Sequence, residues 1–198
     1  MTKSYDWGLY DNSKKDSVIN NATSIFTPKE CDIINNYGLY HNDLKDGSVR
    51  YGDIDHSVRN SKIVFLSSND EEIHWVYRRV TDAILLINKE FYEYDLDKIE
   101  VLQFTSYDYQ SKGFYRPHVD SRAMGSLCRK LSFSIQLSSE DSYAGGDLLF
   151  NFGGGKRTAS KEQGIGLFFP SWVLHEVTPV RTGIRNSLVG WVLGPHFK

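Results

Sequence analysis

The chain has 198 residues, of which 40% are hydrophobic and 24% charged, and its formal net charge is -2. This length suits one domain with a single core and the composition excludes a disordered chain, while the small net charge without blocks of like charge predicts no nucleic-acid partner. The N-terminus lacks an apolar secretory segment and no run approaches the ~18 apolar residues that span a bilayer, so we expect no membrane partner.

The N-terminal region is expected to be irregular before a first helix begins. Residues 1–24 are rich in Asn, Ser, Lys and Asp and show no hydrophobic period, which predicts an arm ahead of a single domain over residues 25–198. Thr27 is a suitable N-cap, Pro28 suits the first helical position, and Glu30 completes a capping box. A helix should therefore start at Pro28.

A long polar segment separates this helix from a second one. Residues 41–60 contain two glycines and no apolar period, which predicts a long loop, and we take this loop as the candidate lid or substrate-contacting segment. From Asn69 to about Phe91, apolar residues recur at helical spacing. This stripe predicts the longest helix of the chain.

The second half of the sequence changes to short β-type runs separated by glycines and polar turns. The runs are 99–107, 114–119, 130–137, 146–150, 164–170, 173–180 and 184–193. Strands spaced by roughly ten residues favour a two-sheet jelly roll or barrel over parallel βαβ units. We therefore predict an α+β, mainly β fold: a double-stranded β-helix, or jelly roll, with the N-terminal helices packed on one sheet.

One of these runs has two different faces. Four large apolar residues alternate with three small polar ones: Leu131, Phe133, Ile135 and Leu137 with Ser132, Ser134 and Gln136. The polar face is either a solvated outer surface, or it lines a ligand pocket while the apolar face packs under the helices. The sequence leaves both interpretations open.

The cysteines indicate the redox compartment. Cys31 and Cys128 are the two cysteines and lie far apart in the sequence. They provide neither a disulfide framework nor a Cys-x-x-Cys metal site, so we expect free thiols in a reducing cytoplasm. Nothing in the sequence indicates the oligomeric state.

Three residues are candidate metal ligands. His118 and Asp120 are two residues apart, so on a strand both side chains leave the same face and reach one ion. This pair alone is weak evidence, because it arises easily by chance among six histidines and 25 acidic residues. His175, in an apolar run, is by itself more often a hydrogen-bonded core residue. Together the three side chains form the two-histidine, one-carboxylate set that leaves open positions on non-haem Fe(II).

Arg185 follows His175 across a turn and is a candidate carboxylate ligand. If residues 181–183 form a three-residue hairpin loop with Gly183 in the left-handed conformation, Val189 pairs with His175 and the odd-numbered residues share a face. That inward face would hold His175, Arg185, Ser187 and Trp191. The planar guanidinium suits a carboxylate because it binds two oxygens at once. A single arginine near a turn usually lies on the surface, so the assignment depends on the whole combination.

In this order, His118-Val119-Asp120, His175 and Arg185 resemble the 2-oxoglutarate- and Fe(II)-dependent dioxygenase superfamily, and more narrowly its prolyl 4-hydroxylase-like, PKHD-type branch. Further similar segments are 102–107 (LQFTSY), 114–120 (FYRPHVD), 131–138 (LSFSIQLS), 143–150 (YAGGDLLF) and 175–180 (HEVTPV). The resemblance implies that His118, Asp120 and His175 bind Fe(II) and that Arg185 holds the distal carboxylate of 2-oxoglutarate.

The resemblance also implies further residues of the co-substrate pocket. Tyr107 matches the family tyrosine of this pocket, but it lies slightly farther from the first ligand than usual, so Tyr109 is the alternative. Gln136 stands where many relatives have a tyrosine that assists the arginine. Ser187 or Thr178 is expected to help bind the same carboxylate, and Trp191 to contribute to the dry wall of the pocket.

The implied activity is hydroxylation of an unactivated C–H bond, with a peptidyl proline as the first candidate substrate. O2 is consumed, succinate and CO2 are the co-products, and ascorbate is a candidate reductant. Asp120 stands in place of the Gly or Ala of halogenating relatives, which favours hydroxylation. The alternatives are an oxygenase of the same type acting on a free amino acid or other small molecule, and a non-catalytic jelly-roll binding module. A zinc hydrolase would also need a general base, and no residue in the sequence stands out as one.

Overall fold

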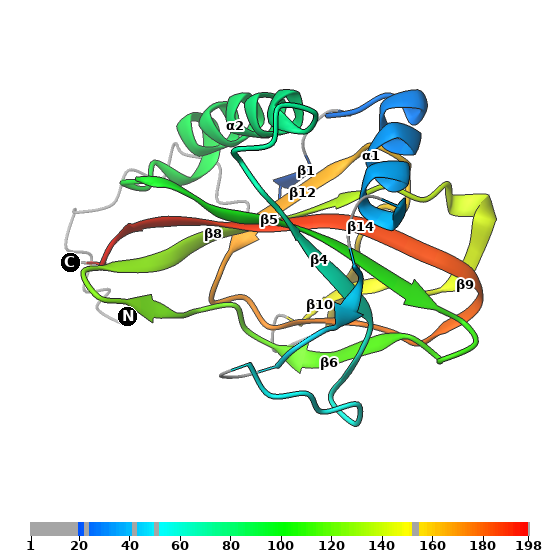
Figure 1. Ribbon diagram of the computed structural model, residues 1–198. Coiled ribbons are helices and arrows are strands. Elements are labelled where there is room, and N and C mark those ends of the chain that lie inside the picture. Colours follow the sequence, from blue (N-terminus) through cyan, green and yellow to red (C-terminus); the bar gives the residue numbers. More distant parts are fainter. Residues whose placement is uncertain (1–19, 22–23, 41–42, 50–51, 152–154, 198) are drawn as a thin grey trace, which may run out of the picture.

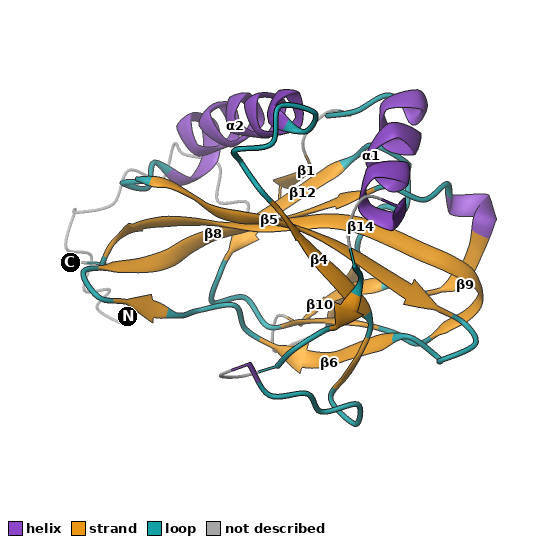
Figure 2. Ribbon diagram, viewed as in Figure 1, coloured by secondary structure: helices purple, strands orange, loops and turns teal. Residues whose placement is uncertain are grey.

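The computed structural model describes residues 20–21, 24–40, 43–49, 52–151 and 155–197. Two antiparallel sheets lie face to face, and helices α1 (Pro28–Tyr40) and α2 (His74–Ile87) cover the outer face of the larger sheet (Figures 1 and 2). Strands make up 43% and helices 22% of the structure. The predicted mainly β jelly roll with helices on one sheet is confirmed. Most of the predicted arm, residues 1–24, lies outside the described residues.

Backbone pairing divides the described strands into two sheets. The larger, nine-stranded sheet has the order β1 (Asn20–Asn21), β12 (Gly166–Pro170), β8 (Leu127–Gln136), β14 (Val180–Pro195), β5 (Lys98–Asp108), β4 (Lys62–Leu66) and β2 (Lys45–Asp46). In addition, β7 (Ala123–Met124) pairs with β8, and β9 (Tyr143–Gly145) pairs with β14. The smaller sheet has the order β11 (Lys156–Thr158), β10 (Leu148–Asn151), β13 (His175–Val177), β6 (Phe114–His118) and β3 (Arg59–Asn60).

Helix α1 begins where the sequence predicts it. The Thr27 N–H donates to the Glu30 carboxylate at 2.8 Å, and the Glu30 N–H donates to the Thr27 hydroxyl at 3.3 Å, which forms the expected capping box. Near its other end the helix lies close to the larger sheet, because a Cβ on Gly38 would come within 2.5 Å of the Phe104 ring. This glycine therefore sets the distance between helix and sheet.

Helix α2 begins later in the sequence than predicted. The expected start was Asn69, but α2 begins at His74 because the preceding residues form turns whose amides bond to Asp70. At the other end, a π-helical turn, η2 (Asn88–Tyr92), continues α2, so the predicted end near Phe91 is confirmed. Asp70, not Asn69, is thus the residue that organises the entry into the helix.

The two faces of β8 lie in different environments. Its large apolar residues, Leu131, Phe133, Ile135 and Leu137, are at most 1% exposed and belong to the core beneath the helices. Burying each such side chain stabilises the fold by about 1.5–3 kcal/mol. The polar residues of the other face are buried too, and Ser134 and Gln136 line a pocket between the sheets. Of the two interpretations that the sequence leaves open, the one in which the polar face lines a pocket is therefore correct.

The described part of the polar segment 41–60, residues 43–49 and 52–60, contributes to both sheets. It contains β2 at one edge of the larger sheet and β3 at one edge of the smaller sheet. The loop prediction is wrong for these two short strands, because pairing at a sheet edge uses backbone groups and needs no alternation of apolar side chains. The segment is thereby held at the junction of the sheets.

Strands β13 and β14 do not form the predicted hairpin. β13 pairs with β6 and β10 in the smaller sheet, whereas β14 pairs with β5 and β8 in the larger one. The predicted partners His175 and Val189 therefore lie in different sheets. Gly183 does have a left-handed φ of 69°, but β14 continues through it while pairing with β9. A glycine turn fixes only local conformation, and the sheet that each flanking strand joins depends on distant partners.

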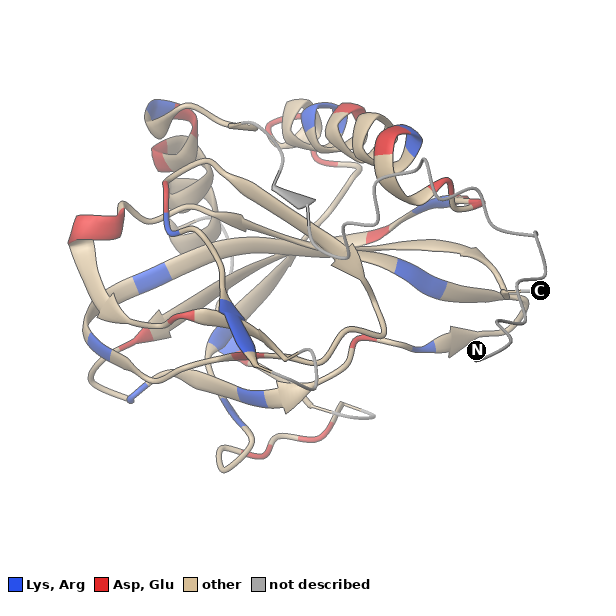
Figure 3. Ribbon diagram, turned by 180° about the vertical axis from the view of Figure 1, so that it is seen from behind, with Lys and Arg blue, Asp and Glu red and all other residues tan. Residues whose placement is uncertain are grey.

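The distribution of charged residues and the state of the cysteines match what the composition predicts. Basic and acidic residues are interspersed along the ribbon seen from behind (Figure 3). Cys31 and Cys128 are both free, as predicted, and burial raises the pKa of the Cys31 thiol to about 12. In the described part of the chain, no helix has the length and apolar character needed to cross a membrane.

Candidate active site

The three predicted metal ligands converge at one end of the space between the sheets. His118 ends β6, His175 begins the neighbouring strand β13, and the two are register partners, while Asp120 lies two residues beyond the end of β6. The Nε2 atom of His175 lies 3.6 Å from Asp120 Oδ2, and that of His118 lies 3.8 Å from Oδ1. One ligand atom from each residue lies within 4.8 Å of the others. The side chains are therefore close enough to bind a common ion.

Backbone carbonyls fix the orientation of both imidazoles. The Nδ1 atom of His118 lies 2.8 Å from the Arg116 carbonyl oxygen, and Nδ1 of His175 lies 2.9 Å from that of Val173. A carbonyl oxygen only accepts hydrogen bonds, so each Nδ1 carries a proton and each Nε2 is turned toward Asp120. This is the arrangement of metal-binding histidines.

The charge states of the cluster suit a divalent cation. Burial, together with the neighbouring His175, holds the pKa of His118 well below its usual range, so this ring is neutral. Burial alone would raise the pKa of Asp120, but the two histidines and hydrogen bonds from Ser132 and Trp191 outweigh it and lower that pKa. Two imidazole nitrogens and one carboxylate fit Fe(II) and leave coordination positions for other ligands.

Trp191 links Asp120 to a partly buried ion pair. The guanidinium of Arg129 lies over the Trp191 ring, 3.9 Å from its centroid. Arg129 also donates two hydrogen bonds, of 2.6 and 2.9 Å, to the Glu100 carboxylate. The Asp120 backbone N–H donates to the Ser171 carbonyl at 2.8 Å. Side chain and backbone of the carboxylate ligand are thus both held before any metal binds.

We expect Trp191→Phe to weaken Co(II) or Fe(II) binding about tenfold, because it removes the N–H that orients Asp120 but keeps the aromatic ring under Arg129. Titration of the apoprotein with Co(II), followed by its visible absorption, measures the change. An unchanged Co(II) affinity would show that this hydrogen bond does not prepare the carboxylate for metal binding.

Aromatic rings enclose the histidine cluster. The Phe169 ring lies edge-on to His175 at 4.8 Å between centroids, and Phe150 is 6.1 Å from the same imidazole. On the other side, Tyr115 stacks on His118 at 3.6 Å. Phe150 and Phe169 are at most 2% exposed. They restrict water to the open side of the cluster.

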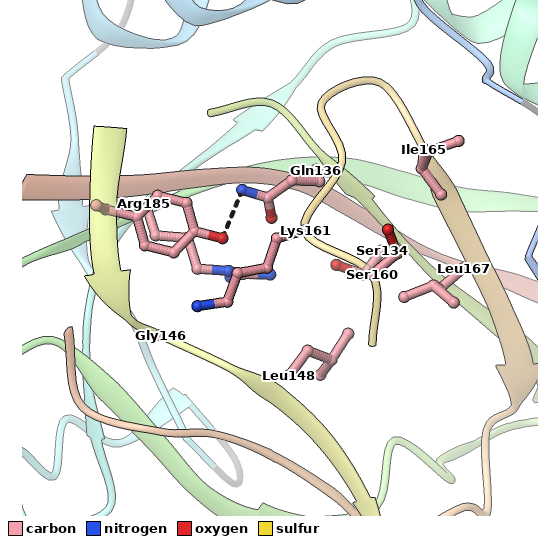
Figure 4. A pocket seen from close by; sticks show the side chains of 10 residues that line it. Ser134, Gln136, Gly146, Leu148, Ser160, Lys161, Ile165, Leu167 and Arg185 are labelled. Atoms are coloured by element: carbon pink, nitrogen blue, oxygen red, sulfur yellow. Dashed lines mark hydrogen bonds between the residues drawn. The ribbon is translucent and has the colours of Figure 1, made fainter. Parts of the chain in front are cut away.

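A polar pocket lined by Arg185 lies between the sheets (Figure 4). Its walls include Ser134, Gln136, Tyr143, Leu148, Lys161 and Arg185. Arg185 is only 3% exposed, donates to the Ser187 hydroxyl at 3.3 Å, and has its guanidinium 5.5 Å from the Tyr107 ring centroid. Among the described residues, no carboxylate lies within ion-pairing distance of Arg185. A buried cation without an anionic partner is costly, so this pocket suits an anionic ligand.

The pocket and the histidine cluster share the same strands. Along β8, Gln136 and Ser134 line the pocket and Ser132, next on the same face, bonds to Asp120. Along β10, Leu148 lines the pocket and Phe150 pairs with His175. Successive residues on one strand face are ~7 Å apart. The arginine pocket and the ligand cluster therefore lie along the same two strands, about one such step apart.

The structure places the predicted pocket residues in different surroundings. Tyr107 is buried and pairs with Arg185 across β5 and β14, whereas Tyr109 is 46% exposed. Gln136 and Ser187 are buried beside the arginine pocket, as expected. Trp191, expected in the co-substrate pocket, lies beside Asp120 instead. Of the two candidate tyrosines, Tyr107 is therefore the one brought to Arg185.

Two pocket residues were missed by the sequence analysis. Tyr143 lies in the segment YAGGD, whose glycines resemble the family, but nothing local indicates that its side chain reaches Arg185. Lys161 follows a stretch of polar residues without any motif. Its ammonium binds Asp147 at 2.7 Å and the Gly145 carbonyl at 2.7 Å. Both residues reach the pocket through pairings between distant segments.

A jelly roll with two histidines and one carboxylate at the end of its inter-sheet space, and a buried arginine farther in, defines the class of non-haem iron oxygenases. Residues 102–193 match the model of the 2OG-Fe(II) oxygenase superfamily. These residues, just under half of the chain, are similar to that superfamily, and the sequence relatives that match are PKHD-type hydroxylases.

Two of these relatives illustrate the extent of the match. The chain is 34% identical over 93 residues to a PKHD-type hydroxylase of Idiomarina loihiensis, covering 47% of this chain and 43% of that protein. It is 37% identical over 78 residues to one of Maricaulis maris, covering 39% of this chain and 36% of the relative. The match thus spans less than half the length of these relatives.

The fold resembles solved prolyl hydroxylases over nearly the whole chain. The prolyl-4-hydroxylase of Pseudomonas putida aligns with a TM-score of 0.70 and 19% identity, covering 90% of this chain and 93% of the other. The prolyl hydroxylase of Trichoplax adhaerens, solved with a peptide fragment of the hypoxia inducible factor oxygen degradation domain, aligns with a TM-score of 0.74, 16% identity and coverage of 89% and 84%. At these identities the likeness establishes the fold.

Proposed function

We propose that the protein is an Fe(II)- and 2-oxoglutarate-dependent dioxygenase that hydroxylates an unactivated C–H bond, with succinate and CO2 as co-products. The observation that carries this proposal is Arg185: a buried guanidinium without a carboxylate partner among the described residues, in the same inter-sheet space as His118, Asp120 and His175. A metal-storage module would need the three ligands but would have no use for this arginine.

Three of the site residues would bind the metal, and a fourth would bind the co-substrate. His118, Asp120 and His175 would hold the iron and leave positions open on it. Arg185 would bind the distal carboxylate of 2-oxoglutarate and so orient its keto-acid end toward the metal. Bound iron and 2-oxoglutarate supply the oxidising chemistry: the co-substrate is decarboxylated, and one oxygen atom of O2 enters succinate while the other enters the substrate.

We further propose a prolyl residue in a peptide or protein as the substrate. The solved structures of similar fold include prolyl hydroxylases, one of them with a bound peptide fragment. Beside the ligands in the sequence, Val119 is 48% and Trp172 54% exposed, so the segments that carry the ligands present apolar side chains to solvent. Such a surface suits the ring of a proline better than the charged groups of a free amino acid.

Anaerobic protein loaded with Fe(II), 2-oxoglutarate and ascorbate, then exposed to O2 with proline-rich peptides, is expected to produce succinate and peptides heavier by one oxygen atom. Succinate is measured by chromatography and the peptides by mass spectrometry, with omission of 2-oxoglutarate as the control. Succinate without peptide oxidation would support the oxygenase but contradict the prolyl substrate. Absence of both succinate formation and 2-oxoglutarate binding would contradict the proposal as a whole.

A further inference from the structure

The hydroxyl group of Tyr143 lies in the arginine pocket and has a defined orientation. Tyr143 is 6% exposed and belongs to β9, which pairs with β14 so that Tyr143 is the register partner of Gly183. Its oxygen accepts a hydrogen bond of 3.0 Å from the Gln136 side-chain amide, drawn as the dashed line in Figure 4. Two segments that are distant in the sequence thus bring the phenol beside Arg185.

The amide of Gln136 determines where the phenol hydrogen points. The same Nε2 atom donates to the Ser138 carbonyl oxygen at 3.2 Å, and because a carbonyl only accepts, the NH2 end of the amide must lie on this side. Gln136 is therefore the donor to Tyr143, and the Tyr143 O–H keeps its own hydrogen for another acceptor. In the described part of the chain, no side chain or carbonyl takes that hydrogen bond.

The surroundings keep Tyr143 rigid and protonated. Lys161 carries its ammonium 4.9 Å from the ring centroid, and because that ammonium already binds Asp147 and the Gly145 carbonyl, it covers the ring without needing a further anion. Burial raises the pKa of Tyr143, although Arg185 opposes this shift. The phenol remains a hydrogen-bond donor at neutral pH.

Gly146 leaves room for the arginine next to this phenol. Its φ of 58° is left-handed, and a Cβ there would lie 3.0 Å from the Arg185 side chain and 3.3 Å from the Tyr143 ring. Any larger residue would push the two side chains aside. The backbone thus permits Arg185 and Tyr143 to face the same small volume.

We infer that Tyr143, oriented by Gln136, is the second donor to the carboxylate that Arg185 binds. The inference rests on the proposed function, because the carboxylate is the distal one of 2-oxoglutarate. Gln136 then has no direct contact with the co-substrate and acts as a positioning residue through Tyr143. Two donors at this end of the pocket favour keto acids with a second carboxylate over those without one.

Tyr143→Phe tests the inference because it removes only the hydroxyl group. Binding of 2-oxoglutarate and of 2-oxopentanoate, which lacks the distal carboxylate, is measured by anaerobic calorimetry with Fe(II)-loaded protein. We expect Tyr143→Phe to weaken 2-oxoglutarate binding about tenfold and to leave 2-oxopentanoate binding unchanged. Tyr40→Phe, on an 80% exposed tyrosine, is the matched control and should change neither affinity.

Gln136→Leu tests the orientation of the phenol in a double-mutant cycle. In the wild-type background it should weaken 2-oxoglutarate binding by a few-fold, and in the Tyr143→Phe background it should have no further effect. Additive losses would show that Gln136 contacts the co-substrate directly and would overturn its positioning role.

The remaining outcomes separate this inference from the proposed function. Unchanged 2-oxoglutarate affinity of Tyr143→Phe, or an equal loss for both keto acids, would overturn the inference while wild-type binding still supports an oxygenase. Wild-type protein that fails to bind 2-oxoglutarate would contradict the proposed function, and the inference with it.

Discussion

Replacing Arg185 by methionine is expected to weaken 2-oxoglutarate binding at least about 100-fold, because two charge-assisted hydrogen bonds to one carboxylate are lost. Metal binding should stay nearly unchanged, since Arg185 contacts none of the three candidate ligands. The apoprotein should be equally stable or more stable by up to about 2 kcal/mol, because a buried cation without a carboxylate partner is replaced by an apolar side chain. Calorimetry and denaturant unfolding measure the two effects.

The prediction is specific because 2-oxoglutarate binding should weaken while the stability of the apoprotein should be retained or increase. A structural arginine would lower stability when removed, and an unimportant one would change neither quantity. Arg78→Met, on an exposed position of α2, controls for the general effect of losing one positive charge. Arg185→Lys keeps the charge but not the planar fork, so its 2-oxoglutarate affinity should lie between wild type and Arg185→Met. Strong destabilisation of Arg185→Met would contradict the binding role.

Features that depend on neighbouring residues were predictable from the sequence. The capping box at Thr27 and Glu30 fixes the start of α1 through contacts within one turn, and the structure contains it. The start of α2 was harder, because both Asn69 and Asp70 are suitable capping residues and only the observed turns distinguish them. Local chemistry predicted the existence of both helices but only one of the two starts.

Features that depend on distant pairing were predicted less well. The turn at Gly183 was recognised, yet the partner of β13 was not, because the sequence cannot show that His175 joins the smaller sheet. The side chains of His175 and Arg185 nonetheless face the same inter-sheet space, His175 from the smaller sheet and Arg185 from the larger. The predicted proximity is therefore found, but from a different topology.

The candidate site shows the same division. His118 and Asp120 follow from the two-residue period of a strand. Tyr107 and Tyr109 have the same parity, and they differ because β5 ends at Asp108: Tyr107 pairs with Arg185, whereas Tyr109 lies beyond the strand and is 46% exposed. Tyr143 was missed because it reaches the pocket only through the pairing of β9 with β14. Its segment resembles the family in sequence, but a sequence motif does not show which side chain approaches Arg185.

Asp120→Asn should reduce Co(II) or Fe(II) affinity by more than the 10–100-fold that is typical for loss of an outer hydrogen bond to a ligand, because it removes the anionic donor itself. The amide keeps the shape of the carboxylate, so the fold and its circular dichroism should be retained. Metal titration by visible absorption gives the affinity, and Asp141→Asn, at an exposed position, is the matched control. Since only the metal-loaded cluster can anchor the keto-acid end of the co-substrate, 2-oxoglutarate binding should weaken in parallel, unlike in Arg185→Met, where metal affinity is retained. If Asp120→Asn kept wild-type metal affinity, the three residues would not form one metal centre, and the oxygenase proposal would lose its basis.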